Sequence, residues 1–267
     1  MDIATSAVWA HIKPSERATH AGLRFGDKGT HTSRTIMLTE LADLLAALPN
    51  SAAREDYAAA VIVDNVLGKA TVATRRSTNQ RLGELYGLDP RLPIFRALRR
   101  LWAVDGAGRP LLALLCALAR DPLLRITAPS VLTLTQGQEL VRSAFTEAVR
   151  TRVGNRLNDA ILGKVLRNAG SSWTQSGHLE GRVRKIRRHV EATPGAVAFA
   201  VWLGSLFSLA GEELLATPWT SVLDRLPGEL HELVLRAKQL RLLQAHIGGD
   251  VVEIDPTGLD RVLEVEG

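Results

Sequence analysis

Residues 171–188 have the side-chain types that could contact a polyanion. Arginine binds phosphate and guanine through two parallel hydrogen bonds, and lysine pairs with phosphate as a point charge. The last seven of these residues contain five cations, which are Arg182, Arg184, Lys185, Arg187 and Arg188. Before them come polar side chains able to hydrogen-bond phosphate or base edges, which are Ser171, Ser172, Thr174, Gln175, Ser176 and His178. The stretch favours nucleic-acid binding; the alternative is a solvated charged face beside an ordinary turn.

The elements expected to position these residues form a helix-turn-helix. Residues 158–167 have a helical pattern, and Ala169-Gly170 predicts a tight turn. Ser171 and Ser172 would then cap a second helix, whose first backbone N–H groups favour phosphate. In the basic run, Val183 and Ile186 are expected to face inward while the cations point outward.

A second basic group lies in the N-terminal half. Arg75 and Arg76 belong to a helix predicted over residues 74–86, and four more arginines follow, namely Arg81, Arg96, Arg99 and Arg100. Such residues are solvated helix faces by default. Arg75 and Arg76 would join a binding surface only if they shared a face with the basic run of residues 182–188.

The end of the chain has the order of a winged helix. Helices are predicted over residues 219–226 and 229–241, and a hairpin around Gly248-Gly249-Asp250 follows within residues 242–254. The second helix has cations, but also Glu229 and Glu232, and the hairpin tip has Asp250 where a phosphate-facing wing would have a cation. The shape could therefore read DNA, or it could be a packing or protein-interaction module.

Composition and periodicity predict a mainly α protein, a multi-helix bundle with helix-turn-helix and winged-helix elements and a small C-terminal β-hairpin. The chain has 267 residues, of which 46% are hydrophobic and 4% aromatic, and a net charge of +5. Residues 1–32 lack sustained periodicity and predict a flexible N-terminal arm. We place an N-terminal helical domain at residues 33–127 and a C-terminal helical domain at residues 128–267, containing the helix-turn-helix and the winged-helix-like end.

An uncharged stretch at residues 192–211 is long enough to span a bilayer, but it favours a buried core helix. Thr193 and Pro194 predict the cap and first turn of that helix, which leaves it short for a membrane. The single cysteine, Cys116, is interpreted as a core residue. With no signal-peptide pattern, we expect a cytoplasmic protein that does not enter a membrane.

Signals of an enzyme or a cofactor are weak. Gly68-Lys69 resembles the end of a phosphate loop, but Val63 stands where the first glycine is needed and a helix precedes it. The seven histidines have no metal-ligand spacing, and no nucleophile elbow occurs. We expect no catalytic residues, no metal and no cofactor.

Residues 62–102 resemble the N-terminal part of the BrxA-like family of bacteriophage-exclusion (BREX) systems. The resemblance is carried by Asn65 and Leu67, then by the Thr74-Arg75-Arg76-Ser77 stretch, and then by Arg81-Leu82. The Ser171-Ser172-Trp173 element and the C-terminal helix with its hairpin also fit. The resemblance implies a non-enzymatic, helical protein that binds double-stranded DNA as a component of a phage-defence system. This component would act beside a DNA methyltransferase, an ATPase and a phosphatase-like protein.

The sequence thus predicts a double-stranded DNA binder that acts mainly through arginine–phosphate contacts, with modest sequence preference. The alternative is a protein-interaction scaffold of the same defence complex without DNA binding of its own. The choice of DNA over RNA and the oligomeric state are both left open by the residues alone.

Overall fold

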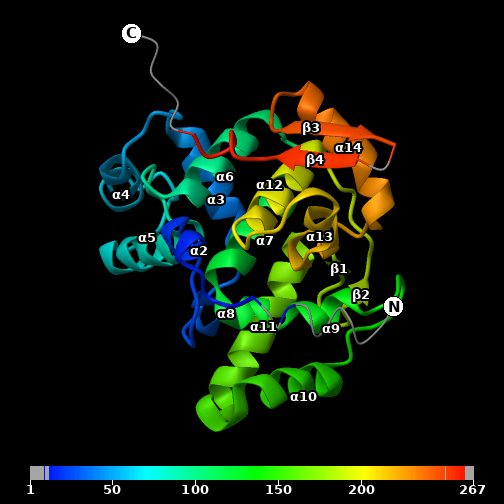
Figure 1. The fold of residues 1–267 in the computed structure, drawn as a ribbon. Coiled ribbons are helices and arrows are strands. Elements are labelled where there is room, and N and C mark those ends of the chain that lie inside the picture. Colours follow the sequence, from blue (N-terminus) through cyan, green and yellow to red (C-terminus); the bar gives the residue numbers. More distant parts are fainter. Residues whose placement is uncertain (1–8, 10–11, 250, 262–267) are drawn as a thin grey trace.

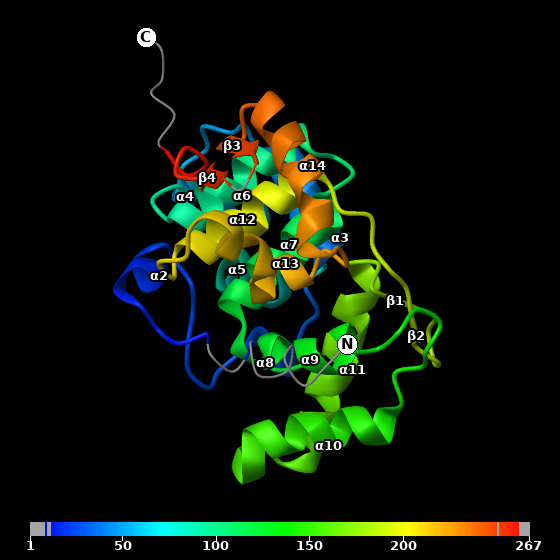
Figure 2. The ribbon, with the colours of Figure 1, turned by 45° about the vertical axis from the view of Figure 1, so that its right-hand side comes forward.

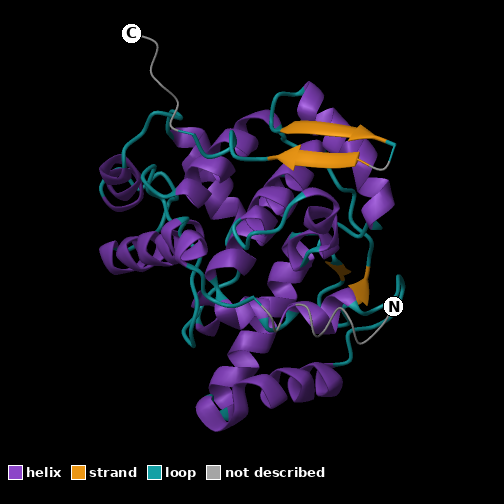
Figure 3. Cartoon of the chain, viewed as in Figure 1, coloured by secondary structure: helices purple, strands orange, loops and turns teal. Residues whose placement is uncertain are grey.

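The computed structural model describes residue 9, residues 12–249 and residues 251–261. The fold is mainly helical with a small C-terminal hairpin, as the sequence predicts, and the described strands form two short antiparallel hairpins (Figure 3). The first half contains α2 (Glu16–His20), η1 (Thr30–Thr32), α3 (Leu38–Ala47), α4 (Arg54–Ile62), α5 (Val72–Tyr86), α6 (Pro93–Val104), α7 (Arg109–Arg120), α8 (Pro122–Arg125) and α9 (Ala128–Leu132). The second half contains α10 (Arg142–Val153), η2 (Gly154–Arg156), α11 (Asp159–Gln175), β1 (Leu179–Glu180), β2 (Ile186–Arg187), α12 (Pro194–Ser205), η3 (Gly211–Ala216), α13 (Pro218–Ser221), α14 (Pro227–Gln239), β3 (Gln244–Gly248) and β4 (Val251–Asp255).

Two helices without a polar face, α7 and α12, lie at the centre of the molecule and pack against each other (Figure 1). Residues 195–205 of α12 are all buried, and so are residues 111–120 of α7. A helix that is apolar all round is stable only inside a core. The Thr193 hydroxyl accepts a hydrogen bond from the N–H of Ala196, and Pro194 occupies the first turn. The predicted core helix is therefore confirmed, and within the described residues no helix has the length and apolarity to cross a membrane.

One hydrophobic core spans the predicted domain boundary. The buried apolar residues before and after residue 128 belong to the same cluster, and α7 packs against both α11 and α12. The predicted division into residues 33–127 and 128–267 therefore does not coincide with a gap in the core.

The N-terminal segment packs onto the core instead of forming an arm. Ala18, Ala21 and Leu23 are buried, and the Ser15 hydroxyl donates to the Leu206 carbonyl at 3.3 Å. His31, in η1, is fully buried. The expectation of a flexible arm is thus wrong for residues 12–32, because small apolar side chains and buried polar contacts hold them in place; residues 1–8 and 10–11 lie outside the described residues.

The helix-turn-helix predicted over residues 158–176 is not formed, because α11 continues from Asp159 to Gln175 without a break. Ala169 and Gly170 are buried within the helix, where a Cβ atom on the glycine would meet only Lys185 Cε, at 4.0 Å. Ser172 and Thr174 do not cap a new helix; their hydroxyls donate to the carbonyls of Asn168 and Gly170, four residues earlier. Packing outweighs the helix penalty of a single glycine, about 1 kcal/mol.

The C-terminal hairpin is confirmed, with Ala245 opposite Ile254 and Ile247 opposite Val252. Of the two helices predicted before it, the second is α14, which packs on α12 and β3. The first is a single turn, α13, instead of eight residues, since the chain takes a left-handed conformation at Asp224 (φ 52°). Asp250, at the predicted wing tip, lies outside the described residues.

Candidate nucleic-acid interface

Four of the residues predicted to contact nucleic acid are buried. Their exposed fractions are 0% for Ser172, 3% for Ser176, 0% for His178 and 1% for Arg187. A duplex cannot reach these side chains in the folded protein, so their assignment as contact residues is corrected. Each one bonds to other parts of the chain, and two polar clusters result.

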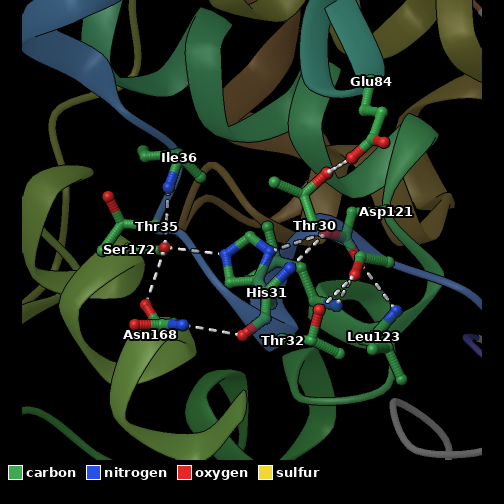
Figure 4. Close-up of polar contacts among 12 residues, drawn as sticks. Thr30, His31, Thr32, Thr35, Ile36, Glu84, Asp121, Leu123, Asn168 and Ser172 are labelled. Carbon is green, nitrogen blue, oxygen red and sulfur yellow. Dashed lines mark hydrogen bonds and ion pairs between the residues drawn. The ribbon is translucent and has the colours of Figure 1, made fainter. Parts of the chain in front are cut away.

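The first cluster joins Ser172 to His31 and Asp121 (Figure 4). The Nε2 atom of His31 lies 2.8 Å from the Ser172 hydroxyl, and its Nδ1 atom lies 2.7 Å from Asp121 Oδ2. The Ser172 hydroxyl also accepts from the N–H of Ile36 at 3.0 Å and donates to the carbonyl of Asn168 at 2.8 Å. Both ring nitrogens of His31 therefore have a polar partner within hydrogen-bond distance.

The same three side-chain types form the catalytic triad of many hydrolases, in which the serine hydroxyl must meet a substrate. Here His31 and Ser172 have no exposed surface, and Asp121 is 1% exposed. The serine oxygen is enclosed by the Ile36 and Asn168 backbone contacts. The cluster therefore fastens η1 to α11 and to the start of α8, and it presents no group to solvent.

Asp121 is a buried carboxylate with several donors. Its Oδ1 accepts from the N–H groups of Leu123 and Leu124, as an N-cap does, and its Oδ2 accepts from the N–H of His31. Burial by itself raises the pKa of Asp121, but the interaction with His31 and these hydrogen bonds outweigh it and hold the pKa below 3.8. Asp121 is therefore charged in the folded protein at neutral pH.

The second cluster is a buried ion pair between Arg187 and Asp224, next to His178. Arg187 Nη1 donates to Asp224 Oδ2 at 3.0 Å, and its Nη2 contacts the other carboxylate oxygen. Ring nitrogens of His178 contact Ser176 Oγ at 2.9 Å and the Val222 carbonyl at 2.8 Å. Burial lowers the pKa of His178 to about 4, so its ring is neutral at physiological pH. Arg187 and His178 therefore hold β1–β2 against the segment that follows α13.

We call residues 138–188, which include the surface cations of this region, the basic lobe. These residues contain eleven lysines and arginines against four acidic residues, a net charge of +7 in a chain whose total is +5. In both ribbon views α10 and the first half of α11 project from the body of the molecule (Figures 1 and 2). Positive charge is therefore concentrated on a part of the molecule that a large ligand could approach.

One face of α11 carries a row of polar and cationic side chains. Lys164, Arg167, Ser171 and Thr174 are spaced by three or four residues, so they are neighbours along one side of the helix. Lys164 and Arg167 are exposed, and Ser171 and Thr174 are half-buried. At 1.5 Å per residue the row is about 15 Å long. We call these four residues the α11 row.

The β1–β2 hairpin continues the α11 row. Lys185 Nζ donates to Thr174 Oγ1 and to the carbonyl of Gly181, at 2.8 Å in each case. The hairpin also pairs with residues 137–140, where the N–H of Leu140 donates to the Lys185 carbonyl at 2.8 Å. Arg142, exposed at the start of α10, comes two residues later. The row, the hairpin turn and this helix start are therefore contiguous.

The remaining cations of the hairpin are exposed. Arg184 pairs with Glu139 at 2.7 Å, and Arg188 pairs with Glu180 at 2.6 Å. Arg182 pairs with none of the residues that the structure describes. Exposed ion pairs of this kind add little stability, so phosphates can replace the carboxylates.

Three other predicted contact residues lie elsewhere. Arg75 donates to the carbonyls of Ile62 and Val63 at the end of α4, and Gln175 bonds to Thr35 and to the N–H of Leu38. Arg76 is exposed, but its helix α5 lies on the other side of the molecule from β1–β2 (Figure 1). Arg75 and Arg76 therefore do not share a face with the basic run.

Sequence reasoning missed Lys164, Arg167 and Arg142. Lys164 and Arg167 lie in phase with Ser171 and Thr174 when residues 159–175 are read as one helix, and this spacing was the available signal. The predicted turn at Ala169-Gly170 concealed it.

Across the described residues, no group of three or more histidine, cysteine, aspartate or glutamate side chains could hold a metal ion. No protein-family model matches the chain, and a search of curated proteins finds no significant match.

Proposed function

We propose that this protein binds double-stranded DNA through the basic lobe, mainly by arginine and lysine contacts to phosphate. The observation that carries the proposal is the contiguous surface made by the α11 row and the β1–β2 turn. It is part of a segment with a net charge of +7, whereas the rest of the chain has a net charge of −2. Phosphate contacts from such a surface release counterions and dominate affinity for duplexes.

The proposed surface differs from the one expected from the sequence alone. Ser171, Thr174, Arg182, Arg184, Lys185 and Arg188 remain in it, and Lys164, Arg167 and Arg142 join them. Placement of the activity in a phage-defence system, beside a methyltransferase, an ATPase and a phosphatase-like protein, is supported by the resemblance to BrxA-like proteins at residues 62–102.

The test is a salt titration of duplex binding by fluorescence anisotropy. Replacement of Lys164 and Arg167 by alanine removes two phosphate contacts, so the slope of log K against log salt should become shallower by about two. Arg76→Ala with Lys238→Ala is the matched control, because it removes the same charge from α5 and α14. The control should bind as the unaltered protein does.

Equal losses in the two variants would mean that net charge, and not this surface, determines binding. Absence of binding to any duplex at low salt would refute the proposal.

A second candidate, an interaction scaffold, is favoured by exposed leucines along α14. Leu226, Leu235 and Leu240 are 66%, 36% and 60% exposed. Leu226 and Leu240 flank the two ends of α14 and Leu235 lies within it, so a protein partner could contact this helix along its length. In this case the chain would co-elute with one of the three proposed companion proteins, and Leu226→Asp with Leu240→Asp would abolish co-elution while leaving DNA binding unchanged.

A further inference from the structure

The β1–β2 turn, residues 181–185, has the features of an element that inserts into a groove. We propose that this turn enters the DNA minor groove, with Arg182 in a narrow A·T-rich groove and Val183 against its sugar walls. The inference rests on the proposed DNA binding and adds the groove and the base preference. The rigidity, the exposure and the size of the turn all fit this groove.

The turn is held in one conformation. Gly181 has a φ of +100°, a conformation that other residues rarely adopt, and a Cβ atom there would collide with the carbonyl of Arg184. Lys185 bridges the Gly181 carbonyl and α11 through Thr174. At the base of the turn, Leu179 and Arg187 are buried. A turn fixed in advance loses little conformational entropy when it binds, so more of its contact energy becomes affinity.

The tip of the turn has an unusual composition for a solvated loop. Val183 is 91% exposed, the highest value among the exposed large hydrophobic residues of the described chain. Arg182 beside it pairs with none of the described residues, so its transfer to DNA breaks no ion pair. The valine contradicts the sequence-based expectation that it faces inward. An apolar side chain flanked by arginines matches the minor groove, which has apolar sugar walls and a negative potential.

The size of the turn decides between the two grooves. Residues 181–184 are exposed, whereas residues 185 and 186 are half-buried, so a single turn protrudes. The major groove is about 12 Å wide and accommodates a whole helix or a two-stranded ribbon, whereas the minor groove is about 6 Å wide. An RNA duplex has a wide and shallow minor groove, which would not hold the turn. The minor groove distinguishes A·T from G·C pairs but little else, so a modest preference follows.

The test measures binding to A·T-rich and G·C-rich duplexes of equal length, with netropsin as a minor-groove competitor and methyl green as a major-groove competitor. We expect tighter binding to the A·T-rich duplex and displacement by netropsin alone. Arg182→Ala should remove the A·T preference. Val183→Ser should weaken binding to both duplexes about fivefold, the loss expected from partial burial of one valine. Neither exposed substitution should change the unfolding temperature, and Arg76→Ala is the control for binding.

Displacement by methyl green alone, or an A·T preference that survives in Arg182→Ala, would overturn the minor-groove assignment. An equal or greater affinity for an RNA duplex would do the same. These outcomes leave the proposed function intact provided that Lys164→Ala with Arg167→Ala still weakens DNA binding. Failure of the unaltered protein to bind any duplex would instead remove both proposals.

Discussion

His31 Nε2 and the Ser172 hydroxyl lie 2.8 Å apart, although 141 residues separate them in the chain. This contact places the N-terminal segment and α11 in one buried polar cluster with Asp121. Water cannot replace a lost partner at a site without exposed surface, so each deletion there leaves unsatisfied groups. The cluster should therefore affect stability much more than it affects binding.

Ser172→Ala should lower the free energy of unfolding by about 3 kcal/mol. The substitution leaves the Ile36 N–H, the Asn168 carbonyl and one His31 nitrogen without their partner, and an unsatisfied buried group costs about 1–3 kcal/mol. Urea denaturation measures the change. Ser171→Ala, one residue earlier on the half-buried face, is the control and should change stability by less than about 0.5 kcal/mol. Weaker DNA binding by Ser172→Ala at unaltered stability would return Ser172 to the interface.

Asp121→Asn should destabilise the protein in a pH-dependent way. The folded pKa of Asp121 lies below 3.8, so the unfolded state takes up its proton at higher pH than the folded state. The stabilisation from the carboxylate is therefore complete above about pH 4 and is lost as the pH falls below that value. At pH 7 we expect a loss of about 3–5 kcal/mol, as for a broken buried pair. The unfolding free energies of the two proteins should differ equally at pH 7 and pH 5 and approach each other at pH 3; a difference that stays constant down to pH 3 would contradict the assignment.

His178 should make the protein less stable in mild acid. Its folded pKa is about 4, and an unfolded histidine has a pKa of about 6.5. Between these values the unfolded state binds a proton that the folded state does not, so stability falls as the pH drops from about 6.5 to about 4. The loss is about 3 kcal/mol in all. Urea unfolding at pH 7.5 and 5 measures it. His178→Gln should reduce this dependence, whereas the exposed neighbour His189→Gln should retain it.

Arg187→Met should destabilise the protein by about 3–5 kcal/mol, because it leaves Asp224 buried and unpaired. Addition of Asp224→Asn should recover part of the loss, since asparagine removes the charge and tolerates the left-handed backbone at this position. Thermal or urea unfolding of the single and double variants gives the coupling free energy between Arg187 and Asp224. Arg188→Met, next in the chain but in a surface pair with Glu180, should change stability by less than about 1 kcal/mol. Similar losses at both arginines would show that Arg187 is not held by a buried pair.

Local signals in the sequence were sufficient for the central helices and the C-terminal hairpin. Thr193-Pro194 marks a helix start that the structure confirms, and Gly248-Gly249 marks the hairpin. Cys116, interpreted as a core residue, is buried in α7. These predictions succeeded because each depends on neighbouring residues alone.

The predicted site was less accurate because its signals are not local. The sequence around a serine or histidine in a polar stretch is the same whether the side chain contacts solvent or a buried partner. The partners of Ser172 are His31 and Ile36, and the partner of Arg187 is Asp224, all remote in sequence. Ala169-Gly170 predicts a break, whereas the burial that keeps α11 continuous depends on segments that the sequence does not place beside it. Arg182, Arg184 and Arg188 are exposed, and they remain in the proposed interface.

The N-terminal segment is synthesised first, but its buried partners leave the ribosome late. Ser15 contacts residue 206 and His31 contacts Ser172, so neither can be satisfied until most of the chain has been made. At about 5–20 residues per second, the delay between His31 and Ser172 is on the order of ten seconds. During that time a nascent chain exposes the apolar residues around α2 and η1. Residues 12–32 are therefore expected to wait long between synthesis and folding, and to be open to chaperones during that time.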